Sequence, residues 1–183
     1  MISDDDRLAA DLAAEAGRRL LALRAAGGAA DELRRAGDRS SHEFLTAELA
    51  RQRPGDAVLS EEGADDLARL SADRVWIVDP LDGTREFGEP GRSDWAVHVA
   101  LWERGELTAG AVALPARDKV LSTADPVKAP APPDPPAVLR LLVSRTRPPE
   151  FMTRLARELD AELVPMGSAG AKAAAVICGD AEA

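Results

Sequence analysis

The most constraining feature of the chain is a run of four apolar residues, Val75 to Val78, that leads directly into two acidic residues, Asp79 and Asp82. An uninterrupted apolar run of this length predicts a short strand that is buried on both faces. Pro80 fixes its own φ angle and lacks a backbone N–H, so the two acids should follow the strand on an irregular turn. The sequence therefore predicts a buried strand that presents two carboxylates at one edge of a sheet.

The residues around these two acids predict a site for a metal ion beside an anion. Asp79 and Asp82, with the carbonyl of Leu81 between them, supply the oxygen ligands that hard cations such as Mg²⁺ prefer. Gly83 lets the backbone approach a ligand closely, and the N–H groups of Gly83 and Thr84 suit an anion where a helix begins. A metal beside an anion suggests a phosphate site. The alternative is an ordinary β-turn, because Asp, Pro and Gly are common turn residues.

The string Asp79-Pro80-Leu81-Asp82-Gly83-Thr84, preceded by an apolar strand and followed by Phe87, resembles the DPxDGT signature of the inositol monophosphatase superfamily. The next residues, Arg85 to Phe87, are more similar to its 3′(2′),5′-bisphosphate nucleotidase branch than to the inositol enzymes. The resemblance extends from about Asp38 to the C-terminal end. It implies a layered α/β fold, an α-β-α-β-α sandwich. It also implies a Mg²⁺-dependent phosphatase that Li⁺ inhibits, with two or three Mg²⁺ ions in the complete enzyme.

Asp38 is the first further candidate that the resemblance supplies. It lies in a segment similar to the Ala-Asp-Arg segment of the bisphosphate nucleotidases, although Gly37 interrupts the pattern. The resemblance implies that Asp38 pairs with Thr84 to activate the attacking water. The alternative is that Asp38 caps a helix or lies in its first turn.

Glu61 is the second further candidate, at the end of a short strand predicted over 57–59. Glu61 and Glu62 resemble the family's Gly-Glu-Glu segment, with Ser60 in place of the small residue. The resemblance implies that Glu61 binds a metal and also holds the attacking water. Adjacent carboxylates repel each other unless a cation or water lies between them, so the alternative is a solvated acidic loop.

Gly167 and Ser168, followed by Lys172, resemble the family's Gly-Ser substrate loop. The resemblance implies that Ser168 and Lys172 contact the non-scissile part of the substrate, while Gly83 and Thr84 hold its phosphate. The alternative is a Gly-Ser pair that merely precedes a helix. Both interpretations stay open at this point.

The remaining pattern predicts two α/β units. We expect helices over 3–26 and about 38–51, with Ser3 and Asp6 as a capping box, and a strand meander over 94–124. His98 falls in the middle of a predicted strand and is expected to be packed or partnered rather than catalytic. Residues 1–126 form the first predicted domain, 127–136 a proline-rich linker, and 137–183 a second α/β unit of strand, helix, strand and helix. In its first helix, Phe151, Met152, Leu155 and Leu159 should point inward.

Composition narrows the classes of partner. The formal net charge of −9 argues against binding to a nucleic-acid polymer or an anionic membrane and leaves a small phosphorylated molecule as the expected partner. A single cysteine excludes an intramolecular disulfide and suggests a reducing compartment. An acidic start and the lack of a long apolar run predict a cytoplasmic protein. The oligomeric state is left open, with a homodimer as one expectation.

The resemblance implies hydrolysis of the 3′-phosphate of adenosine 3′,5′-bisphosphate or of its sulfated relative, as in sulfur assimilation. Alternatives are an inositol monophosphate or fructose-1,6-bisphosphate phosphatase, or an inactive module that binds phosphate or metal. Members of the family continue for several dozen residues past the point that corresponds to Ala183, through a Trp-Asp motif whose Asp binds a second metal. We therefore expect residues 1–183 to leave that second site incomplete and a chain of these residues to be nearly inactive.

Overall fold

The computed structural model describes residues 2–64, 66–128 and 138–183 of the chain. It contains a five-stranded sheet in the order β1-β2-β3-β4-β5 and a two-stranded sheet of β6 and β7. The helices and strands are α1 (Asp4–Ala26), α2 (Ala30–Gln52), β1 (Ala57–Ser60), β2 (Arg74–Asp82), α3 (Thr84–Phe87), β3 (Ala96–Glu103), β4 (Glu106–Leu114), β5 (Lys119–Ser122), β6 (Arg140–Ser144), α4 (Glu150–Leu159), β7 (Glu162–Met166) and α5 (Ala169–Ile177).

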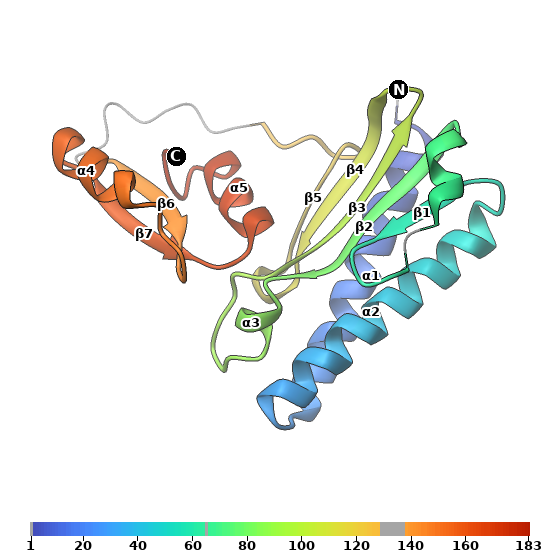
Figure 1. Ribbon diagram of the computed structural model, residues 1–183, viewed down its shortest axis with the longest axis horizontal. Helices are drawn as coiled ribbons and strands as arrows, with labels where there is room; N and C mark the ends of the chain where they lie inside the picture. Colours follow the sequence, from blue (N-terminus) through green and yellow to red (C-terminus); the bar gives the residue numbers. More distant parts are fainter. Residues whose placement is uncertain (1, 65, 129–137) are drawn as a thin grey trace.

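The elements form layers, as the predicted α/β sandwich requires. Figure 1 shows α1 and α2 on one side of the larger sheet, and α5, the smaller sheet and α4 following one another on the other side. Short 3₁₀ turns over Leu67–Ser71 and Pro115–Arg117 complete the first part. Within the described residues, no helix is long and apolar enough to cross a bilayer.

Helix α1 begins and ends where its sequence predicts. The Ser3 hydroxyl accepts a hydrogen bond from the Asp6 N–H at 3.1 Å, and the Asp6 carboxylate accepts one from the Ser3 N–H at 2.7 Å. This reciprocal pair is the expected capping box. Gly27 follows the helix at φ 76°, a conformation that favours glycine. The buried side of α1 packs on β3 and β4 through Leu8, Leu12, Ala16 and Leu20.

Helix α2 is longer than predicted, because it begins at Ala30 instead of near Asp38. The acids Asp31 and Glu32 lie in its first turn, where their negative charges interact favourably with the positive end of the helix dipole. Asp38 is therefore in the middle of the helix, and the alternative that it caps the helix is wrong. Leu45 and Leu49 are buried, whereas Ala50 is exposed.

Strand β2 is the centre of the larger sheet. It pairs in parallel with β1 and antiparallel with β3, and it continues to Asp82 through a register shift between Asp79 and Asp82. The prediction that the strand is buried on both faces is wrong at Ile77, which is 38% exposed. Trp76 and Val78 are buried on the side covered by α1 and α2, and Ile77 points to the opposite side of the sheet. The predicted meander is confirmed as β3, β4 and β5, all antiparallel.

The second part of the chain is a strand–helix–strand unit, in which β6 and β7 are parallel. On helix α4, Ala156 is buried and Met152 and Leu155 are half-buried, while Phe151 and Leu159 are 58% and 47% exposed. The prediction that these two residues point inward is wrong, because two strands offer too little surface to cover a broad apolar face. Most of the predicted proline-rich linker, residues 129–136, lies outside the described residues. The boundaries 1–126 and 137–183 therefore stay predictions.

A polar cluster at the start of β2 joins this strand to α1, to β3 and to the residue before β1. Arg74 contacts Asp5 of α1 at 2.9 Å, Asp56 before β1 at 2.9 Å and Glu103 of β3 at 3.3 Å. Asp56 also accepts a hydrogen bond at 2.8 Å from the indole N–H of the fully buried Trp76. A buried indole N–H without an acceptor is costly, so Asp56 stabilises both the cluster and the core.

Replacing Asp56 tests this interpretation. Asp56→Ala leaves Trp76 without an acceptor and Arg74 with one fewer carboxylate, and it should lower the free energy of unfolding by about 1–3 kcal/mol. Asp56→Asn keeps an oxygen that can accept the hydrogen bond from Trp76, so its free energy of unfolding should fall by less. Urea unfolding of both variants, with the exposed Asp73→Ala as control, measures the difference. Equal losses in Asp56→Ala and Asp56→Asn would show that the indole hydrogen bond contributes nothing.

Candidate active site

The end of β2 brings two predicted acids together with a histidine from β3. Asp79 lies opposite His98 in the β2–β3 register, and the His98 Nε2 atom is 3.0 Å from the Asp82 carboxylate. Asp79, Asp82 and His98 each offer one ligand atom, and these atoms lie within 4.8 Å of one another, in a search limited to the described residues. The structure thus contains a carboxylate and histidine group that could hold a metal ion. His98 is partnered, as expected, but its acid comes from the neighbouring strand.

Asp82 is the most heavily hydrogen-bonded acid of the site. Its carboxylate accepts hydrogen bonds from the Ser168 hydroxyl at 2.6 Å and the Gly170 N–H at 2.7 Å, both at the start of α5. Burial alone would raise the pKa of Asp82, but the hydrogen bonds from His98, Ser168 and Gly170 outweigh it and lower the pKa to about 2. Asp82 therefore stays ionised and joins the two parts of the chain. Its role as a metal ligand stays a prediction.

Asp79 has the opposite environment. One of its oxygens accepts a hydrogen bond from the Leu81 N–H at 3.1 Å. Burial, followed by the charges of Glu61 and Asp82, raises the pKa of Asp79 to about 7. A divalent cation would offset this repulsion, and the oxygen donors suit Mg²⁺. The residues therefore fit a hard cation, although the imidazole of His98 is a less typical Mg²⁺ ligand.

Glu61 lies beside this group without joining it. Its backbone N–H donates to the Val78 carbonyl at 3.3 Å, which fixes the loop after β1 against β2. The exposed side chain lines a cavity of about 560 Å³ together with Asp79, Asp82 and His98. Glu61 is thus placed where it could complete a metal site, but its carboxylate is not among the three ligand atoms within 4.8 Å.

Thr84 forms the pair that the sequence predicts with Asp38. The Thr84 hydroxyl donates to the Asp38 carboxylate at 3.1 Å and lies 3.0 Å from the Leu81 carbonyl, so its hydrogen is shared. Burial and the nearby charges of Glu62 and Glu61 raise the pKa of Asp38 to about 6, despite the hydrogen bond from Thr84. The contact exists, while the catalytic role of the pair stays a prediction. The Leu81 carbonyl keeps a second lone pair for a metal.

Two supporting side chains of α2 were not found from the sequence. The Ser41 hydroxyl, 1% exposed, donates to the Pro80 carbonyl at 2.8 Å. His42 is 2.8 Å from the Ser60 hydroxyl, directly before Glu61. Ser41 lies three residues after Asp38 on the same face of a helix, and this spacing was the available signal.

The predicted substrate residues lie at the junction of the two parts. Ser168 caps α5 and donates to Asp82, and the Lys172 ammonium donates to the Gly167 and Ser168 carbonyls at 2.6 and 3.0 Å. Gly83 has φ 89°, and a Cβ there would lie 3.0 Å from the Asp94 carbonyl oxygen. Ser168 thus joins the two parts, Gly83 allows their close approach, and Lys172 binds the loop before its own helix. Their contact with substrate stays a prediction.

The raised pKa of Asp79 predicts that metal binding depends on pH. A proton competes with the cation below the pKa of about 7, and the carboxylate is ionised above it. The dissociation constant for Mg²⁺ should therefore fall about tenfold between roughly pH 6 and pH 8, with protons released on binding. Calorimetric titration in buffers of different ionisation enthalpy measures both effects. In Asp79→Asn the pH dependence should weaken, and pH-independent binding by the unaltered protein would contradict the prediction.

Comparisons with known proteins identify the family of the chain. Residues 6–183 match the inositol monophosphatase family. A 3′-phosphoadenosine 5′-phosphate phosphatase of Mycobacterium tuberculosis (strain CDC 1551 / Oshkosh) is 54% identical over 177 residues, which cover 92% of this chain and 66% of the relative. The enzyme of the same name from Mycobacterium leprae (strain TN) is 51% identical over 192 residues, with 98% and 70% covered. The chain thus spans about two thirds of the length of these curated relatives.

Solved structures share the fold. Mycobacterium tuberculosis SuhB superposes with a TM-score of 0.74 at 25% identity, covering 96% of this chain and 74% of its own. Inositol monophosphatase-II from Staphylococcus aureus MSSA476 superposes with a TM-score of 0.75 at 22% identity, covering 94% and 70%. The resemblance inferred from the string at 79–84 is confirmed, and the chain belongs to the inositol monophosphatase family.

Proposed function

We propose that the protein is a metal-dependent phosphomonoesterase that removes the 3′-phosphate of adenosine 3′,5′-bisphosphate or of its sulfated relative, a reaction of sulfur assimilation. The observation that carries the proposal is the group of Asp79, Asp82 and Glu61 on one cavity. The 54% identity to a relative named 3′-phosphoadenosine 5′-phosphate phosphatase supports this substrate over inositol phosphates. We further propose a cytoplasmic protein that acts on small molecules, with no nucleic-acid or membrane partner, and a homodimer as its assembly.

Mg²⁺ is the proposed cofactor, and Li⁺ the proposed inhibitor. Asp79, Glu61 and the Leu81 carbonyl would hold one ion. Asp82 would hold a second ion together with Asp79. Bound Mg²⁺ lowers the pKa of a coordinated water and offsets charge on the phosphoryl oxygens. Asp82 would have to exchange part of its hydrogen bonding to α5 for this role, because Ser168 and Gly170 already donate to it.

The pair of Thr84 and Asp38 would orient the attacking water. Thr84 donates its hydrogen to Asp38, so its oxygen keeps a lone pair that can accept a hydrogen bond from water. Asp38, with a pKa of about 6, is ionised above that pH and can hold the Thr84 hydroxyl in this orientation. The Gly83 and Thr84 amides would hold the phosphate in line with the water.

Replacement of Asp79 tests the enzyme proposal. Asp79→Asn removes a charged ligand and should lower kcat/KM for adenosine 3′,5′-bisphosphate with Mg²⁺ by more than about 100-fold. Loss of a residue that only hydrogen-bonds to a metal ligand already lowers metal affinity or activity by about 10- to 100-fold. The fold should be retained, as judged by circular dichroism. Asp73→Asn, the same change at an exposed acid before β2, is the matched control.

A substrate panel tests the choice of substrate. Adenosine 3′,5′-bisphosphate should be hydrolysed with a higher kcat/KM than inositol 1-phosphate or fructose 1,6-bisphosphate. The reverse order would assign the protein to another branch of the family. Binding of Mg²⁺ without turnover of any of the three would identify a binding module, and activity in Asp79→Asn equal to that of the unaltered protein would refute the metal site.

A further inference from the structure

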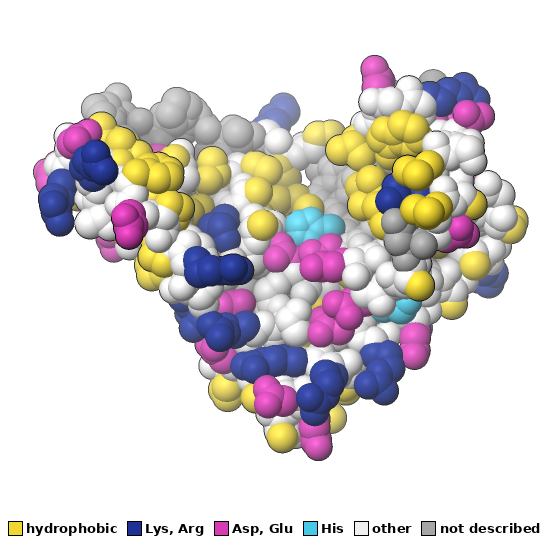
Figure 2. Space-filling model, in the orientation of Figure 1, with side chains coloured by type: hydrophobic (Ala, Val, Ile, Leu, Met, Phe, Trp, Pro, Cys, Tyr) yellow, Lys and Arg dark blue, Asp and Glu magenta, His cyan; other side chains and the backbone are white. Residues whose placement is uncertain are grey.

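A second cleft lies beside the candidate active site and is lined by arginines. It has a volume of about 540 Å³, and its walls come from α3, from the segment after β6 and from Gly167. Three arginines line it, Arg85, Arg145 and Arg147, with Glu86 as its acidic residue. Figure 2 shows Lys and Arg side chains gathered next to the acidic side chains in the middle of this face. This concentration of positive charge stands out in a chain whose net charge is −9.

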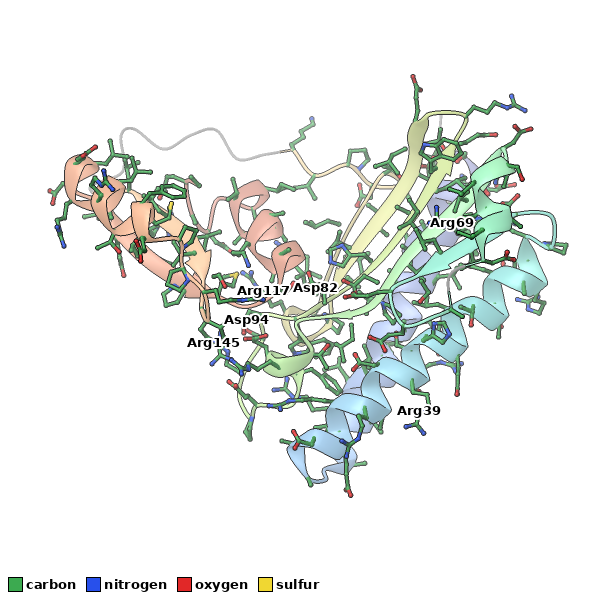
Figure 3. All side chains as sticks on the ribbon, in the orientation of Figure 1. Arg39, Arg69, Asp82, Asp94, Arg117 and Arg145 are labelled. Atoms are coloured by element: carbon green, nitrogen blue, oxygen red, sulfur yellow. The ribbon has the colours of Figure 1, made fainter. Side chains whose placement is uncertain are left out.

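The three arginines are not equivalent. Arg145 donates to Glu86 at 2.7 and 2.9 Å and to Glu89 at 2.9 Å, and Glu86 is 5% exposed. Arg145 therefore neutralises a buried acid and belongs to the packing between α3 and β6, where Figure 3 labels it. Within the described residues, the guanidinium groups of Arg85 and Arg147 make no hydrogen bond or ion pair. The positive charge of Arg85 attracts the Glu89 carboxylate without contacting it, and Arg145 already donates a hydrogen bond to Glu89. Two exposed positive charges thus line the cleft without a direct partner.

The cleft and the carboxylate group share a wall. Gly167 lines the cleft, and the next residue, Ser168, donates to Asp82 at 2.6 Å. A Cβ at Gly167 would lie 2.2 Å from the Glu86 carboxyl carbon, so the loop is pressed directly onto α3. Arg85 directly follows Thr84, whose hydroxyl donates a hydrogen bond to Asp38. A ligand that holds one anionic group at the carboxylate site can therefore reach the arginines across the Gly167–Ser168 backbone.

We propose that Arg85 and Arg147 bind the non-scissile phosphate of a bisphosphate nucleotide while its other phosphate lies at the carboxylate site. The proposal rests on the proposed function and names the residues that would select a substrate with two phosphates. A guanidinium group binds phosphate oxygens in a bidentate manner, and two of them match a dianion. The hydroxyls of Ser144 and Thr146, on the same cleft, can donate further hydrogen bonds.

A pair of substrates tests the proposal. Adenosine 3′,5′-bisphosphate and adenosine 3′-monophosphate carry the same scissile group, but the second lacks the other phosphate. In Arg85→Ala and in Arg147→Ala, the ratio of kcat/KM for the bisphosphate to that for the monophosphate should fall about tenfold, mainly through KM. Arg147→Lys keeps a point charge and should recover part of the ratio. Arg154→Ala removes an arginine of α4 that does not line the cleft, and it should keep the ratio of the unaltered protein.

Binding of adenosine 5′-monophosphate separates this proposal from the proposed function. This nucleotide has no 3′-phosphate, so its affinity reports on the arginine cleft without turnover. The dissociation constant should rise about tenfold in each alanine variant and stay constant in Arg154→Ala. If the protein hydrolyses neither substrate, the proposed function fails, and this titration alone decides whether Arg85 and Arg147 bind a phosphate. A ratio and an affinity that both stay at the values of the unaltered protein, or equal losses with both substrates, would overturn the proposal.

Discussion

The hydrogen bonds between Asp82 and the start of α5 are the contact on which the rest of the structure depends. A carboxylate that is largely removed from water is costly unless donors replace its hydration, and here His98, the Ser168 hydroxyl and the Gly170 N–H replace it. The positive end of α5 adds to the effect. A Cβ at Gly170 would lie 2.3 Å from His98, so this approach requires a glycine. Asp82 thereby joins the five-stranded sheet to the smaller unit, together with Asp94, whose carboxylate accepts a hydrogen bond from the Gly167 N–H at 2.7 Å.

The same contact gives the two acids of the β2 end different properties. Asp82 is surrounded by donors and has a pKa of about 2, whereas Asp79 receives one hydrogen bond, faces like charges and has a pKa of about 7. Three residues apart in the chain, one carboxylate is stabilised by the protein itself and the other would be stabilised by a cation.

Helix α2 supports the site from the other side. Asp38 and Ser41, three residues apart, reach Thr84 and the Pro80 carbonyl, while His42 reaches the hydroxyl of Ser60 before Glu61. Gly37 directly precedes Asp38 on the same helix, and a Cβ there would lie 2.7 Å from the Phe87 ring. The glycine that interrupts the familiar Ala-Asp-Arg pattern is therefore explained by packing, since it lets α2 lie directly on the residues that follow the site.

The sequence by itself determined the elements whose signals are local: the capping box of α1, the strand before Asp79, the meander, and the pairing of Asp38 with Thr84 through a resemblance to a family. It missed the start of α2, although Asp31 and Glu32 are local signals for it. It also missed the exposure of Ile77 and of Phe151, because each depends on how much surface a distant element covers. Only the tertiary structure placed His98 on Asp82, Ser41 on Pro80, and Arg85 and Arg147 on one cleft. The members of each pair are at least 16 positions apart, and their placement follows from strand register and packing, which no local pattern of side chains specifies.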